Sequence, residues 1–188
     1  VSIAPDGKVA DWLVIAYTDP QFERTVDGML RTMTFALPEA GTSAPGPAGP
    51  VRGTLRFLFE AHGVVISQTV NDTVSSMVRR MTGIRRIDKM GTIRDLDRSL
   101  VAHHTVQPYN PLAGTRPAAS AAPAKVTLEF LVDENGRVRM PVLHEGEDPA
   151  LANAAAAALL AWQFEPPTRQ GRPVIVSARQ EFIFNPAR

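Results

Sequence analysis

Residues 134–167 read ENGRVRMPVLHEGEDPALANAAAAALLAWQFEPP, and this stretch decides the fold. Asn135-Gly136 supplies the positive φ that a tight β-hairpin turn requires. Asp148-Pro149 predicts a helix start, because the aspartate caps N–H groups and proline needs none at the first helical position. The residues that follow at helical spacing are Leu151, Ala155, Ala158, Leu159 and Trp162. The stretch therefore predicts strand, turn, strand and helix, followed by a last strand from Pro173 to Phe184.

The same order of features occurs a second time near the start of the chain. Gly7 precedes Gly136 by 129 positions, and Asp19-Pro20 precedes Asp148-Pro149 by the same number. The apolar face of the first helix is expected to consist of Phe22, Val26, Met29, Leu30 and Met33. A final extended run from Val51 to Phe59 closes the first copy. The sequence thus predicts an α+β fold with two small domains, each a three-stranded antiparallel sheet with one helix packed on a face (β-β-α-β).

The first domain is expected over residues 1–60 and the second over residues 125–188. Residues 61–124 do not repeat and are expected to form a connector, which contains an extra strand at Val64–Val70, a short helix at Asp72–Met81 and a Pro/Ala-rich linker from Pro108 to Pro123. Because a domain of about 60 residues buries only about 60% of its unfolded surface, we expect mutual packing or a partner to stabilise each domain. The first strand of copy one is shorter than its counterpart, so we expect that residues before Val1 were removed or not included.

Composition excludes several classes of function. The 188 residues are 44% apolar and 21% charged, as in ordinary globular proteins, and the net charge of +1 gives no electrostatic footprint for nucleic acid. The absence of cysteine excludes disulfides, thiol catalysis and thiolate metal sites. Basic residues of the connector are interpreted as a solvated or internally paired surface, with contact to anionic lipid or cell wall as the alternative.

We predict neither catalytic nor metal-binding residues. His103 and His104 are adjacent, so on a strand they would point in opposite directions and could not share a metal. Asp95 and Asp97 are interpreted as solvated charges, because nothing nearby in the sequence indicates a pocket or a raised pKa. Trp162 is expected to belong to the hydrophobic core together with Phe164.

Residues 125–185 resemble the C-terminal domain of TonB, the periplasmic part of a bacterial energy transducer. The motifs that carry the resemblance are, in order, Gly136-Arg137-Val138, Asp148-Pro149, Ala161-Trp162-Gln163-Phe164-Glu165-Pro166, Gly171-Arg172-Pro173-Val174 and Phe182-Ile183-Phe184. Residues 107–113 are similar to the family's proline and tyrosine segment, with the departure that Asn110 separates Tyr109 from Pro111. Residues 1–60 look like a degenerate second copy of the same domain.

The resemblance implies a non-enzymatic periplasmic module without a cofactor. Such a module binds an extended segment of a TonB-dependent outer-membrane receptor by β-strand addition, and it couples inner-membrane energy to outer-membrane transport. An exposed sheet edge suits this role, because it offers unpaired N–H and C=O groups to an incoming strand. The candidate partner-binding residues are Ser177, Arg179, Gln180, Glu181, Phe182, Ile183, Phe184, Gln107, Pro108 and Tyr109.

The resemblance also implies contact with proton-motive motor proteins of the inner membrane, through an N-terminal anchor that is not in this sequence. The alternative hypothesis is a cell-envelope scaffold that uses the same fold for protein–protein contacts or as a homodimer. Whether both copies bind a partner stays open. A strand at Val64–Val70 would already occupy the edge of the first copy and leave the second as the functional site.

Overall fold

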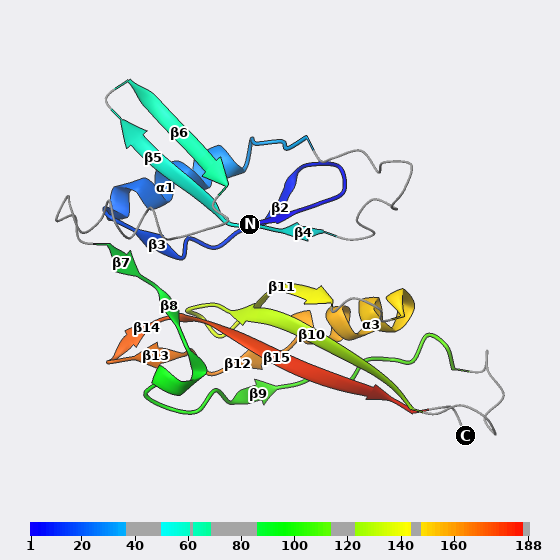
Figure 1. Cartoon of the computed structure of the whole chain (residues 1–188). Helices are drawn as coiled ribbons and strands as arrows, with labels where there is room; N and C mark the ends of the chain where they lie inside the picture. The colour runs from blue at the N-terminus through cyan, green and yellow to red at the C-terminus, as the bar shows by residue number, and fades with distance from the viewer. Residues whose placement is uncertain (37–49, 61, 69–85, 114–122, 144–147, 186–188) are drawn as a thin grey trace. The chain divides into compact units, whose positions relative to one another are not determined.

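A computed structural model describes residues 1–36, 50–60, 62–68, 86–113, 123–143 and 148–185. Contacts divide the chain into two compact units, a first unit of Val1–Asp88 and a second unit of Lys89–Arg188 (Figure 1). In its described residues, each unit combines one α-helix with small, mainly antiparallel sheets, so the predicted α+β fold is confirmed. Residues of the predicted connector occur in both units, and its predicted helix at Asp72–Met81 lies outside the described residues.

The second unit is built on two long strands, β10 (Ala124–Val132) and β15 (Ile175–Phe184). They pair antiparallel over nearly their whole length, from Ala124↔Phe184 to Val132↔Val176. The neighbouring strands are β11 (Val138–Leu143), which is antiparallel to β10, and β8 (Met90–Gly91), which is parallel to the start of β15. The strand order is therefore β11-β10-β15-β8, with β8 added to the three strands expected from the sequence.

Helix α3 (Pro149–Leu160) covers one face of this sheet. The Oδ1 atom of Asp148 accepts a hydrogen bond from the Ala150 N–H at 2.9 Å, which confirms the predicted cap. Alternate residues of β10 are buried in the same core as the helix, as the two-residue period of a strand requires: Val126, Leu128, Phe130 and Val132. Ala152 and Ala155 are fully buried, and their small side chains let the helix lie close to the sheet.

The hairpin between β10 and β11 packs directly on the segment that follows the helix. Gly136 has a φ of 79°, as predicted for a tight turn, and the Phe164 N–H donates to its carbonyl oxygen at 2.8 Å. A Cβ atom at Gly136 would lie only 2.0 Å from the Phe164 carbonyl oxygen. The turn therefore needs glycine for both its conformation and its close approach to Phe164.

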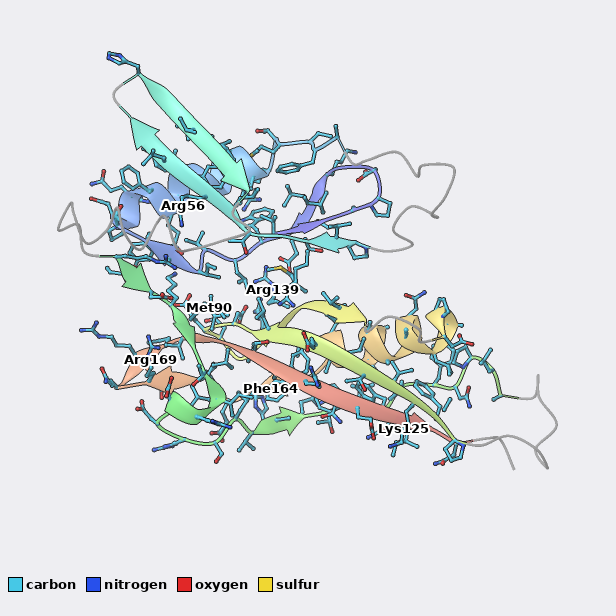
Figure 2. The ribbon with its side chains drawn as sticks, viewed as in Figure 1. Arg56, Met90, Lys125, Arg139, Phe164 and Arg169 are labelled. Atoms are coloured by element: carbon cyan, nitrogen blue, oxygen red, sulfur yellow. The ribbon has the colours of Figure 1, made fainter. Side chains whose placement is uncertain are left out.

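Residues 89–113, which we call the strap, run along the second unit and belong to it. The strap contains η1 (Ile93–Asp95) and β9 (Ala102–His104). The short strands of the unit that lie outside the strap are β12 (Gln163–Phe164), β13 (Thr168–Arg169) and β14 (Arg172–Pro173). β9 pairs with β12, and β13 pairs with β14. The Nη1 atom of Arg169 donates to the Met90 carbonyl at 3.0 Å (Figure 2). Backbone pairing and side-chain bonds thus fix the strap to the unit.

In the first unit, the features predicted near Gly7 are found at the expected positions. Its elements up to the helix are β1 (Ser2–Ile3), β2 (Val9–Asp11), β3 (Ala16–Tyr17) and α1 (Pro20–Leu30). Asp19 caps α1 through the Gln21 N–H at 2.8 Å, and the Phe35 N–H donates to the Gly7 carbonyl at 2.8 Å. These contacts match those of Asp148 and Gly136. That the units are copies of one domain stays a prediction.

The run predicted from Val51 to Phe59 is found as two strands, β4 (Val51–Arg52) and β5 (Leu55–Glu60). β4 pairs with β1, and the Gly53 N–H donates to the Val1 carbonyl at 3.0 Å. Beyond this point β5 pairs with β6 (Gly63–Gln68), so the chain changes its partner and the run is interrupted. β7 (Ile87–Asp88) pairs with β3.

Candidate functional site

The sequence-predicted binding strand lies at an edge of the sheet for most of its length. β8 pairs with β15 only at Ile175 and Val176. From Ser177 to Phe184, no strand among the described residues pairs with β15 on the side away from β10. We call this side of Ser177–Phe184 the free edge. It is the longest stretch of unpaired backbone on either long strand of the described sheet.

One hydrogen bond shows which backbone groups face the free edge. The Ile175 N–H donates to the Lys89 carbonyl at 2.7 Å, which lies on the β8 side of the strand. Because N–H and C=O groups alternate between the two sides of a strand and the register with β10 is unbroken, the other odd-numbered residues face the same way: Ser177, Arg179, Glu181 and Ile183. Their backbone groups are the ones available to an added strand.

The side chains of β15 divide between the core and solvent. Phe182 and Phe184 are buried at 5% exposure, and the Phe182 ring meets the Trp162 ring edge-on at 5.7 Å. Ala178 and Gln180 are half-buried, whereas Ser177, Arg179, Glu181 and Ile183 are exposed. Of the predicted binding residues, the two phenylalanines therefore face the core. The exposed odd-numbered side chains are the ones that a partner strand could contact.

The exposed side chains beside the free edge are joined to β10 by ion pairs. Lys125 Nζ lies 3.1 Å from Glu181 Oε1 (Figure 2 labels Lys125), and the Arg179 guanidinium is paired with Glu129. These groups are largely solvated, so each pair adds little to stability. They give the free edge an ordered series of charges, with Arg179 followed by Glu181 and then the apolar Ile183.

The opposite edge of the sheet, on β11, is less suited to strand addition. Met140 has a φ of 48°, and the pairing with β10 changes register between Glu129 and Leu131. Pro141 follows Met140 and has no N–H to donate. A bulge and an edge proline are devices by which proteins prevent edge pairing.

The predicted segment Gln107-Pro108-Tyr109 is held between two fixed points of the second unit. Trp162 Nε1 donates to the Val106 carbonyl at 2.8 Å, and Asn110 Nδ2 donates to the Asn185 carbonyl at 3.0 Å. Asn185 directly follows the last residue of β15, so the segment lies near the end of that strand. Tyr109 is 72% exposed there. The hydrogen bonds found at this segment involve its neighbours Val106 and Asn110, and the role of Tyr109 in partner binding stays a prediction.

Asp97 of the strap holds the turn between β13 and β14. Its two carboxylate oxygens accept hydrogen bonds from the Gln170 N–H at 2.7 Å and the Gly171 N–H at 2.8 Å. Its own N–H donates to the Thr168 carbonyl at 2.8 Å. The bonds from Gly171 and Gln170 lower the pKa of Asp97 below its ordinary value. The interpretation as a merely solvated charge was therefore incomplete, because Asp97 also fixes the strap.

This lowered pKa predicts a pH dependence of stability. An acid with a lowered folded-state pKa contributes stability above its unfolded pKa and loses it as the pH falls through the folded value. Between about pH 5 and about pH 3, we expect the free energy of unfolding to fall more in the wild type than in Asp97→Asn. Urea unfolding of both proteins across this range measures the difference. If the free energy of unfolding falls equally with pH in the two proteins, the lowered pKa of Asp97 is contradicted.

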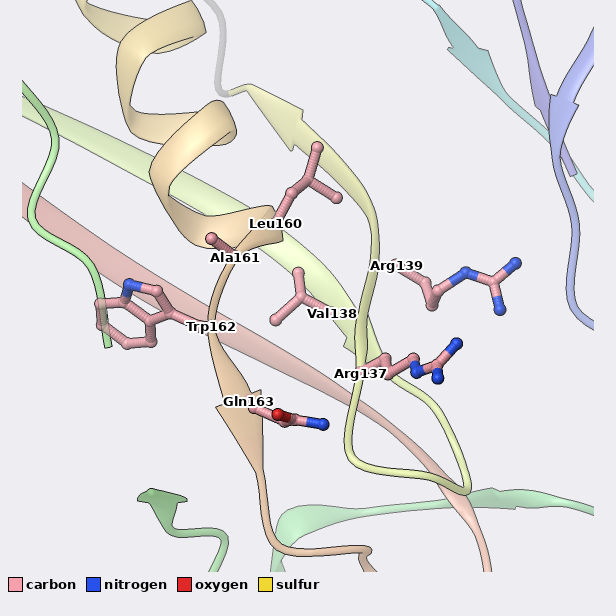
Figure 3. A pocket seen from close by; sticks show the side chains of 7 residues that line it. All are labelled: Arg137, Val138, Arg139, Leu160, Ala161, Trp162 and Gln163. Atoms are coloured by element: carbon pink, nitrogen blue, oxygen red, sulfur yellow. The ribbon is translucent and has the colours of Figure 1, made fainter. Parts of the chain in front are cut away.

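A shallow hollow of about 460 Å³ lies where the end of α3 meets β11 (Figure 3). Its lining residues are Arg137, Val138, Arg139, Leu160, Ala161, Trp162 and Gln163. Arg139 Nη1 is bound to Asp133 at 3.3 Å. None of the lining side chains is a nucleophile with an adjacent base, so the hollow does not form a catalytic constellation.

The described residues contain neither a cluster of metal ligands nor a helix suited to span a membrane. No group of three or more His, Cys, Asp or Glu side chains in this part of the chain is arranged to hold a metal ion. Among the helices of the described ranges, none is both long and apolar enough to cross a membrane.

Part of the second unit matches a known protein family. Residues 118–186 match the family described as Gram-negative bacterial TonB protein C-terminal. The match includes β10, β11, α3 and β15, and it covers no residue of the first unit. A search of curated proteins found no match. Over residues 118–186, the predicted resemblance to the TonB C-terminal family is therefore confirmed.

Proposed function

We propose that this protein is the periplasmic part of a TonB-like energy transducer that captures an extended segment of an outer-membrane receptor at the free edge of β15. TonB C-terminal domains are periplasmic protein-interaction domains whose partners are outer-membrane receptors. The observation that carries the proposal is that, among the described strands, none pairs with Ser177–Phe184 on the side away from β10. No catalytic step is part of the proposal.

The proposed mechanism is strand addition. The outward N–H and C=O groups of Ser177, Arg179 and Ile183 would bond to the backbone of the incoming segment. The Glu181 carbonyl already accepts a hydrogen bond from Gln180 Nε2 at 2.7 Å, so this side chain must move aside when the segment binds. Main-chain bonds give affinity for any extended chain, whereas the exposed charges beside the edge give modest selectivity.

Coupling to the inner membrane is the remaining part of the proposal. We infer that residues preceding this sequence anchor the full-length protein in the inner membrane and contact proton-motive motor proteins there. This inference follows from the family to which residues 118–186 belong. The alternative, an envelope scaffold that assembles through its own edges, is favoured by the exposed apolar hairpin of β5 and β6 in the first unit.

An NMR titration tests the proposal. A synthetic peptide with the sequence of a receptor's periplasmic segment is added to the isotopically labelled chain, and backbone amide shifts are recorded in both units. We expect the largest shifts at the outward N–H groups of Ser177, Arg179, Glu181 and Ile183. Shifts concentrated on β11, or no shifts at saturating peptide, would contradict capture at β15.

A further inference from the structure

The hairpin of β5 and β6 in the first unit exposes an unusual amount of apolar surface. Leu58 is 52% exposed and Val65 is 51% exposed, and the register places them directly opposite each other. Directly paired residues share a face, so these two side chains form one apolar patch. Val64 and Ile66 are also exposed, at 38% and 37%.

The other face of this hairpin contacts helix α1. The Phe59 ring stacks on the Phe22 ring of α1 with centroids 4.4 Å apart (Figure 1 shows the hairpin beside α1). Phe59 pairs with Val64, so Val64 also points to the α1 side. The patch of Leu58 and Val65 therefore lies on the face turned away from the helix.

The sequence of β6 has none of the residue types that prevent edge pairing. Gly63–Gln68 reads GVVISQ, which has no charge, no proline and three consecutive β-branched residues. Among the described residues, no strand pairs with β6 except β5. An exposed, apolar and uncharged edge of this kind is a site of strand pairing. The free edge of β15 differs, because charged side chains lie along it.

We propose that the β6 edge pairs antiparallel with the β6 edge of a second copy of this chain, so that the two hairpins form a continuous four-stranded sheet. A two-stranded hairpin is marginal in water unless one face is packed, and two further strands would add to the stability that contact with α1 provides. Pairing about a two-fold axis places β6 of one copy against β6 of the other. Because β6 is uncharged, this contact brings no charge repulsion.

A second copy fits this edge better than a charged segment does. β6 has no charge with which to select a polar partner, while its β-branched side chains pack well against identical ones. The patch of Leu58 and Val65 would become continuous with its copy across the axis. This association uses the first unit and is independent of peptide capture at β15.

Sedimentation equilibrium of the 188-residue chain tests the proposal. We expect the wild type to reach twice its 20.4 kDa mass as concentration rises. Val65→Lys places two like charges near the axis and should weaken the dimer by about tenfold or more. Val65→Thr keeps the β-branched shape without a charge and should leave the dimer intact. A wild type that stays monomeric, or a Val65→Lys variant that dimerises as well as Val65→Thr, would overturn the proposal.

The absence of cysteine allows a second measurement that locates the contact. Single substitutions Val64→Cys, Val65→Cys and Ile66→Cys are oxidised in parallel with Val101→Cys, which alters a residue of the second unit that is 47% exposed. We expect rapid covalent dimers from at least one β6 position and none above background from Val101→Cys. Equal cross-linking at all four positions would show random collision and refute the β6 contact, even if the chain dimerises.

Discussion

Replacing Gly136 by alanine is expected to unfold the second unit. The new Cβ would lie 2.0 Å from the Phe164 carbonyl oxygen, and the residue would have to keep a φ of 79°. The left-handed conformation alone costs about 1–2 kcal/mol, and relieving the clash requires breaking the bond between the Phe164 N–H and the Gly136 carbonyl. We expect a loss of at least about 4 kcal/mol, measured by urea unfolding followed through NMR signals of β10.

Gly171→Ala is the matched control for this prediction. Gly171 also has a positive φ, 72°, but no atom lies within 4 Å of the position where its Cβ would be. This substitution should cost only about 1–2 kcal/mol. If Gly136→Ala and Gly171→Ala are equally destabilising, the close approach to Phe164 does not determine the stability of the turn.

Arg179→Pro is expected to weaken peptide capture at the free edge strongly while the sheet remains folded. The Arg179 N–H faces away from β10, so proline removes an N–H that would donate to the incoming segment and leaves the pairing with β10 intact. Loss of this bond and contact of the proline ring with the added strand should weaken binding by at least about tenfold. Titration calorimetry with the receptor-segment peptide measures the change. Unchanged affinity would exclude the free edge as the binding site.

Two controls separate the backbone effect of Arg179→Pro from other causes. Arg179→Ala removes the ion pair with Glu129 but keeps the N–H, so it should retain most of the affinity. Gln180→Pro removes an N–H that faces β10 and should destabilise the fold far more than Arg179→Pro. The reverse order of stability for the two proline variants would show that the outward residues have been assigned to the wrong side.

The features of the fold that could be predicted are those encoded by neighbouring residues. Asn135-Gly136 predicts its turn because only certain residues adopt a positive φ easily, and Asp148-Pro149 predicts a helix start for reasons within one turn of helix. Phe164 is buried in the core as expected, and Trp162 is half-buried against it. The last strand was also predicted, from Pro173 to Phe184, whereas the side chains of this strand that meet the core were not.

The features that escaped prediction depend on partners distant in sequence. Asp97 bonds to Gln170 and Gly171, more than 70 positions away, and no pattern near Asp97 indicates this. The parallel pairing of β8 with β15 involves only Met90 and Gly91, which is too short for a period to show. Nothing in the sequence around Gly53 indicates that the run from Val51 pairs first with β1 and then with β6. Such contacts depend on tertiary packing, and the local preferences of residues for helix, strand or turn do not predict them.

The strap determines where a mechanical load enters the second unit. A pull on the chain before Lys89 acts first on the bond between its carbonyl and the Ile175 N–H and on the ion pair of Lys89 Nζ with Glu134 at 3.2 Å. The contacts of Asp97 and Val106 lie further along and would be stretched in turn. Because the first of these bonds is to Ile175, the load enters at the start of β15, and the strap would extend only as its contacts break one after another.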